Sequence, residues 1–326
     1  MPNMDARPMG GYFELELPPG RSPFPAGYPV NLGRAGLELI VRARGYTRVF
    51  VPEYICPVVF EKLKALGLEC CVYTVDEKLE IDCPVPSLRT TDGLLYVNYF
   101  GMKNAYCDQL ARSVKNLILD LAQAFFYTPP AHTDAFNSAR KFVGVPDGGY
   151  VFGDFVTTLA LPRAASWRQC EHLLCRLDGD VAGGYQIFKT NESSMRDWPS
   201  LRMSTATERM LHAANWESIR RQRIDNVQCL HGLLGGVNRF MIGGLGEQAP
   251  LCYPLLIPNG AAVKRELIAR RIFVPTYWPN PELNVLLTPA TQTFVANLVC
   301  LPIDQRYGVS EMSWLAAQYR KCMGEL

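Results

Sequence analysis

Three side chains with complementary chemistry lie close together in the chain: the carboxylate of Asp120, the hydroxyl of Ser138 and the amine of Lys141. Asp120 closes the apolar run NLILD, a pattern typical of a buried parallel strand. Open α/β sheets bind ligands at the carboxyl ends of their strands, so this carboxylate should emerge where a ligand sits. Ser138 and Lys141 form a Ser-x-x-Lys pair, and a Pro-Asp-Gly-Gly turn follows them.

These residue types match the requirements of pyridoxal phosphate (PLP). This cofactor binds a lysine amine covalently, needs donors for its phosphate, and acts as an electron sink while its ring nitrogen stays protonated. Lys141 is the candidate for covalent attachment, and Ser138 could donate its hydroxyl to the phosphate. Asp120 would favour the charged ring. Gln123, one turn further on if a helix begins there, could hydrogen-bond the phenolic oxygen.

Each of these residues also has an ordinary explanation. An Asp at a strand end often only caps a helix, and a lysine usually lies on the surface. Ser-x-x-Lys also resembles the acylating pair of serine hydrolases and β-lactamase-like enzymes. That class needs Ser-Asp-Asn and Lys-Thr-Gly elements, and the sequence contains neither. The joint pattern therefore favours PLP.

From about residue 30 to residue 306, the chain resembles the DegT/DnrJ/EryC1/StrS family of fold-type I PLP enzymes, whose best-known members aminate nucleotide-linked keto sugars. The segments that carry the resemblance are LILDLAQ and AFNSARKFVGVPDGGYVF. The resemblance gives Asp120 and Gln123 the roles of ring partners and Lys141 that of the covalent lysine. A subset of the family has His in place of this lysine and performs dehydration, so Lys141 argues against that branch.

Two further segments resemble parts of the family's cofactor site. NLGRAGLELIVRARG is similar to the phosphate-binding turn, with Gly33 where a helix N-terminus would present its amides. Arg34 stands where the family has Thr, so that contact becomes guanidinium to phosphate or is lost. RVFVPEYICPVVFEKLKALG is similar to the loop that stacks on the ring, which makes Tyr54 or Cys56 the candidate. Asn98 replaces a family His.

The last third of the chain resembles the family with lower specificity. Arg202, Arg220 and Trp278 are candidates to approach substrate or cofactor, although a basic helix is more often a solvated face. The resemblance implies an aminotransferase that moves an amino group from glutamate to a keto sugar, in a homodimer with shared active sites. Two alternatives stay open: another fold-type I enzyme with a non-sugar substrate, and a non-catalytic binding protein.

The order of apolar and amphipathic segments predicts the fold. Short strands alternate with helices to about residue 190, which indicates a mostly parallel sheet covered by helices. A long helix is expected over residues 196–232, followed by a strand–helix–strand tail. We therefore expect an α/β fold of fold-type I, with a large PLP-binding domain at 1–215 and a smaller C-terminal α+β domain at 216–326.

Composition limits the remaining functions. A net charge of +2 supplies no strong field for nucleic acid, and no apolar span reaches membrane length. We expect a cytoplasmic protein of sugar or surface-polysaccharide synthesis. Its eleven cysteines are odd in number and form no Cys-x-x-Cys pair, which suggests reduced thiols. The four histidines lack the spacing of metal ligands, so no metal is expected.

Overall fold

The structure, a computed structural model, describes residues 9–84, 87–241, 243, 245–279 and 287–324. Its largest element is a seven-stranded sheet with the order β1-β7-β6-β5-β4-β2-β3. The strands are β1 (Tyr28–Val30), β2 (Arg48–Pro52), β3 (Glu69–Tyr73), β4 (Asp92–Val97), β5 (Leu117–Leu121), β6 (Asp134–Asn137) and β7 (Gly149–Phe152).

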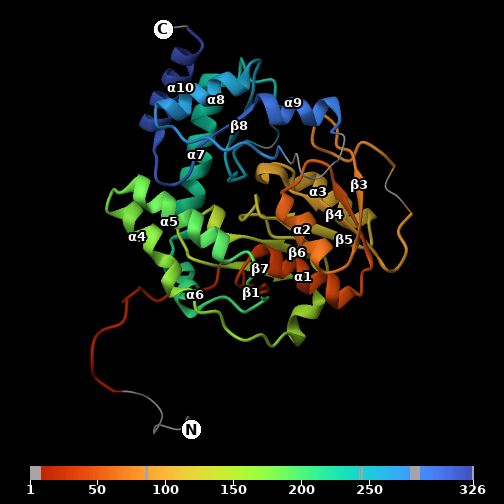
Figure 1. Cartoon of the computed structure of the whole chain (residues 1–326). Helices are drawn as coiled ribbons and strands as arrows, with labels where there is room; N and C mark the ends of the chain where they lie inside the picture. Colours follow the sequence, from red (N-terminus) through yellow and green to blue (C-terminus); the bar gives the residue numbers. More distant parts are fainter. Residues whose placement is uncertain (1–8, 85–86, 242, 244, 280–286, 325–326) are drawn as a thin grey trace.

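The direction of the strands confirms the mostly parallel sheet. Strands β3, β2, β4, β5 and β6 run parallel, whereas β7 is antiparallel to both β6 and β1. Every residue of β4, β5, β6 and β7 is buried, as expected for a sheet that helices cover on both faces. The helices of this part are α1 (Gly33–Arg44), α2 (Pro57–Ala65) and α3 (Asn104–Ser113), drawn around the sheet in Figure 1.

Helices α4 to α7 lie between β7 and the next strand. Helices α4 (Glu171–Leu177) and α5 (Val181–Ser194) pack on each other and project at the left of Figure 1. Helices α6 (Thr205–Ala213) and α7 (Trp216–Leu234) come next. The prediction of one long helix over residues 196–232 is therefore wrong. Asn215 accepts a hydrogen bond from the Ser218 amide at 3.0 Å and starts a new helix there, because a side chain that satisfies an N-terminal amide favours a helix start.

The C-terminal part has a core of its own. Helix α7 packs with the antiparallel pair β8 (Tyr253–Leu256) and β9 (Leu298–Leu301), and with α8 (Gly260–Ala269) and α10 (Val309–Cys322). Helix α9 (Pro289–Asn297) lies between this part and the sheet (Figure 1). Since α7 contributes to both cores, through Trp216 at one end and Leu230 at the other, the division at residue 215 stays a prediction.

In the described ranges, none of the helices combines the length and the apolar character that crossing a bilayer requires.

The turn that follows Lys141 depends on a glycine. A Cβ at Gly149 would collide with the carbonyl of Asn137, so we predict that Gly149→Ala lowers the free energy of unfolding by about 1–3 kcal/mol in urea denaturation. The control is Gly232→Ala, at an exposed position of α7 with open space around it. This change should raise stability by about 0.5–1 kcal/mol. Equal effects of the two changes would contradict the packing described.

Candidate active site

Asp120 lies at the carboxyl end of the central strand β5, as predicted. Its side chain is 5% exposed, and Oδ1 accepts a hydrogen bond from the Ala122 amide at 2.8 Å. This bond turns the chain after the strand, so no helix begins there. Among the described residues, no cationic group forms an ion pair with Asp120. Burial raises the pKa of this carboxyl, and nearby Lys141 lowers it in part. The site therefore fits a cationic group opposite Asp120.

Gln123, three residues after Asp120, offers a buried hydrogen-bond donor. The residue is 1% exposed, and its Oε1 accepts from the Phe100 amide at 2.9 Å. Its Nε2 is buried and has no partner in the described parts of the chain. A buried donor without a partner costs free energy, so an acceptor on a bound ligand would stabilise the site. A phenolic oxygen fits this position chemically.

Lys141 belongs to the 3₁₀ turn η3 (Ala139–Lys141), which follows strand β6. The side chain is exposed and lines a cavity of about 810 Å³, together with Arg140 and His172. It also lies within electrostatic reach of Asp120 and Cys56. The amine is therefore accessible from outside and lies close enough to the Asp120 carboxylate to act on its charge.

The N-terminus of α1 lies against the segment that carries Ser138. A Cβ added to Gly33 would come within 3.1 Å of the Asn137 carbonyl oxygen and 3.7 Å of the Ser138 Cβ, so glycine allows this close approach. The first amides of a helix attract anions. Gly33 and Ser138, predicted separately from sequence, are thus brought to one place.

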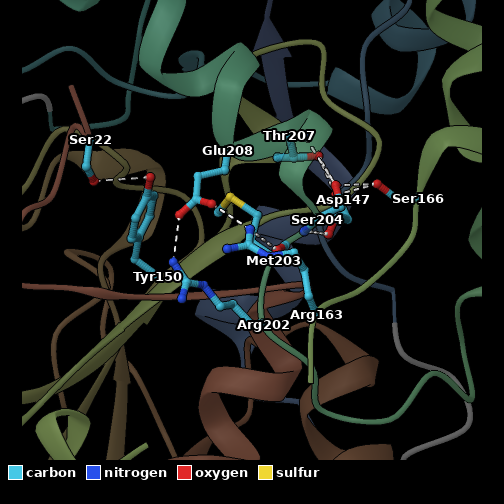
Figure 2. A network of polar contacts seen from close by, with 10 residues as sticks. All are labelled: Ser22, Asp147, Tyr150, Arg163, Ser166, Arg202, Met203, Ser204, Thr207 and Glu208. Carbon is cyan, nitrogen blue, oxygen red and sulfur yellow. Dashed lines mark hydrogen bonds and ion pairs between the residues drawn. The ribbon is translucent and has the colours of Figure 1, made fainter. Parts of the chain in front are cut away.

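A second buried carboxylate, Asp147, lies at the centre of a network of hydrogen bonds, which Figure 2 shows. Asp147 is fully buried and accepts hydrogen bonds from the hydroxyls of Ser166 and Ser204 at 2.7 Å each, from Thr207, and from the Ser204 amide at 3.0 Å. The next residue, Gly148, accepts a hydrogen bond from the amide of Ala139 and donates its own amide to Asn31. The network therefore ties the turn of Lys141 to the start of α1.

The structure separates the two candidates for the ring-stacking residue. Tyr54 is fully buried, donates its hydroxyl to the Tyr277 carbonyl at 2.6 Å, and packs against Trp278 with 5.1 Å between ring centroids. Cys56 is only partly buried and caps α2. Burial raises the pKa of this thiol, whereas Lys141 lowers it. Cys56 therefore lies within electrostatic reach of Lys141 and Asp120, whereas Tyr54 belongs to a buried aromatic cluster.

Arg34 points from the first turn of α1 toward the end of α5. Its Nη2 donates to the Met195 carbonyl at 2.8 Å, and its Nε is buried without a partner among the described residues. Burial lowers the pKa of this guanidinium, and the like charge of Arg140 lowers it further. Arg140 in turn forms an ion pair with Glu192. Neither Arg140 nor Glu192 was predicted, although Arg140 precedes the candidate lysine directly.

The other candidates have structural partners. Arg202 forms an ion pair with Glu208 at 3.0 Å, and Arg220 donates to the Glu247 carbonyl. Asn98 is fully buried and uses both ends of its amide, toward Asn104 and the amide of Lys103. Trp278 belongs to the aromatic cluster of Tyr54. These residues therefore use their side chains for contacts within the protein.

One structural residue was missed by sequence analysis. Arg223 is 1% exposed, donates to the carbonyls of Phe142 and Pro250, and lies over the Phe142 ring. Burial lowers the pKa of this guanidinium to about 10. Arg223 therefore fixes the residue after Lys141 to the C-terminal part.

No protein-family model and no curated protein matches the sequence. Solved structures match its fold. Spr1654 of Streptococcus pneumoniae, a putative sugar aminotransferase in its PMP form, is 14% identical, with a TM-score of 0.66 over 92% of this chain and 86% of that one. A DegT DnrJ EryC1 StrS aminotransferase of Brucella abortus is 16% identical, with a TM-score of 0.64 over 90% and 85%. DesI, solved with its TDP-sugar product, is 17% identical, with a TM-score of 0.64 over 92% and 81%.

The predicted fold is thereby confirmed: this chain has the fold of these aminotransferases.

Asp120 and Asp147 are both buried but differ in their partners, which gives a test. Because burial raises the pKa of Asp120, the folded state holds its proton more tightly than the unfolded state, and stability falls as pH rises through the folded pKa. Asp120→Asn should therefore stabilise the protein without cofactor at pH 8 by about 1 kcal/mol or more, and have little effect near pH 4.

The matched control is Asp147→Asn. It replaces a carboxylate that three hydroxyls and an amide satisfy, so it should destabilise the protein by about 1–3 kcal/mol at pH 8. The measurement is urea unfolding of both variants at several pH values. Destabilisation by Asp120→Asn at pH 8 would mean that its carboxylate already has a stabilising partner.

Proposed function

We propose that this chain is a PLP-dependent aminotransferase that transfers an amino group from glutamate to a keto sugar. Two residues together carry the proposal. Asp120 is a buried carboxylate without an ion pair among the described residues, and Lys141 is an exposed lysine within its electrostatic reach. The Nε2 of Gln123, which has no partner among the described residues, supports the proposal, since it supplies a buried donor three residues after that carboxylate. The chemistry that PLP supplies when bound is a reversible covalent link to amines and an electron sink.

Each residue would then have one task. Asp120 would hold a proton on the ring nitrogen, and Gln123 would donate its Nε2 to the phenolic oxygen. Cys56 would pack on the ring face. The amine of Lys141 would hold the cofactor between turnovers and, once displaced, carry the proton between the donor α-carbon and C4′. The start of α1, with Gly33, Arg34 and Ser138, would hold the phosphate.

The acceptor of the amino group and the cellular process are proposed from the similarity to solved structures. DesI was solved in the presence of its TDP-sugar product, and this supports a nucleotide-linked keto sugar as the acceptor. We place the reaction in the cytoplasm, in the synthesis of a surface polysaccharide or of an amino sugar. Two alternatives stay open, a non-sugar substrate and a non-catalytic binding protein, and the spectroscopic test that follows decides the second of them.

Absorbance spectroscopy tests the cofactor and the lysine together. Wild-type protein mixed with PLP should develop a visible band that glutamate bleaches, whereas Lys141→Arg should lack the band and lose amino transfer by about 10³-fold or more. Lys115→Ala, at an exposed lysine outside the site, is the control and should match the wild type. A wild-type protein that folds but shows no band would favour the non-catalytic binding protein.

We also propose a homodimer with shared sites. Exposed apolar side chains gather on and beside the α4–α5 pair: Trp167, Leu174, Leu177, Tyr185 and Phe188. Three of them, Leu174, Leu177 and Phe188, also line the cavity of Lys141. A second copy would cover them, since large exposed apolar patches usually mark interfaces.

Leu177, which is 82% exposed, is the residue to change. Leu177→Asp should shift the protein from dimer to monomer in analytical ultracentrifugation, because a charge would be buried at the interface. Val309→Asp, at an exposed apolar position at the start of α10, is the control and should leave the dimer intact. A wild type that sediments as a monomer would refute the dimer.

A further inference from the structure

Two arginines meet at the end of α5 with only one carboxylate between them. Arg34 reaches this point from α1, and Arg140 reaches it from η3. Glu192 of α5 forms an ion pair with Arg140 and lies within electrostatic reach of Arg34. Two guanidinium groups thus share one carboxylate, which leaves one positive charge uncompensated at this spot. Glu61, which also acts on Arg34, is already paired with Arg196.

Both guanidinium groups also have unused donors. The Nε atoms of Arg34 and Arg140 are buried, and neither has a hydrogen-bond partner in the described segments. The side chain of Arg140 is only 14% exposed, so water does not readily replace the missing acceptor. Guanidinium groups bind the oxygens of phosphate through paired N–H donors.

The surroundings favour a ligand that carries more negative charge than Glu192. His172 lies within electrostatic reach of Arg140 and supplies no negative charge to it. The N-terminus of α1, a helix of twelve residues, lies beside Ser138 and adds the favourable end of its dipole. A phosphomonoester dianion would balance both arginines, whereas a single carboxylate balances one.

Glu192 is well placed to be exchanged. Its side chain is 44% exposed, so the carboxylate can move into water at small cost when a stronger anion arrives. We propose that Arg34 and Arg140 form a binding site for a phosphate group, which Glu192 fills as an internal substitute until the ligand displaces it. The identity of the ligand as the phosphate of PLP rests on the proposed function, whereas the anion site itself does not.

Binding measured by calorimetry tests the site without reference to catalysis. The probes are inorganic phosphate, PLP, and pyridoxal, which lacks the phosphate. Glu192→Gln should bind inorganic phosphate about 10-fold more tightly than the wild type, because the competing anion is removed. Arg140→Gln should bind phosphate and PLP about 10-fold or more weakly but leave pyridoxal binding unchanged. The control is Glu171→Gln, which makes the same charge change at an exposed position of α4 and should have no effect.

The outcomes separate this site from the proposed function. Phosphate binding that Glu192→Gln strengthens, without any binding of pyridoxal, would support the anion site while the aminotransferase proposal fails. Equal phosphate affinity in the wild type and in Glu192→Gln would overturn the exchange, even if PLP binds through Lys141. Since Glu192 is exposed, its variant should fold, and circular dichroism will check Arg140→Gln.

Discussion

A carboxylate buried at the end of the central strand is the constraint on which the rest of the site depends. Asp120 is 5% exposed and forms no ion pair with any described residue, so its charged form is costly in the protein alone. Proteins keep such a group where a ligand compensates it, and perturbed carboxyls gather at functional sites for this reason. A protonated ring nitrogen would supply the missing positive charge, and the cost of burial would become binding free energy.

A second network of hydrogen bonds holds the other elements of the site in place. The Asp147 network holds the Gly148–Gly149 turn, and Gly148 bonds both to the first residue of η3 and to Asn31 ahead of α1. The elements that would hold the aldehyde and the phosphate of the cofactor are therefore fixed relative to each other. Three hydroxyls and an amide make this second buried carboxylate favourable in the absence of any ligand.

Sequence alone could predict the parts of the site that lie close together in the chain. The strand end at Asp120, the Ser-x-x-Lys pair and the glycine turn follow from local patterns with few alternatives, and the parallel sheet follows from alternating strands and helices. It could not show how Tyr54 and Cys56 differ in their surroundings, since Tyr54 is buried by contacts with Tyr277 and Trp278, more than two hundred residues away.

Contacts of long range were missed for the same reason. Glu192 of α5 pairs with Arg140 of η3 across fifty-two residues of chain, and Arg223 reaches Phe142 from the C-terminal part. The break between α6 and α7 had a local signal in Asn215, a good N-cap residue, but the helical pattern on both sides concealed it. The roles given to the site residues stay predictions until the cofactor is bound.

The most direct test of the central claim is the protonation state of the ring nitrogen, read by NMR of the protein loaded with PLP labelled with ¹⁵N in the ring. If Asp120 compensates a cationic ring, the nitrogen should keep the shift of a protonated pyridine well above the pH at which free PLP loses that proton, and Asp120→Asn should abolish this. A ring nitrogen that is unprotonated at neutral pH in the wild type, with PLP bound, would contradict the account.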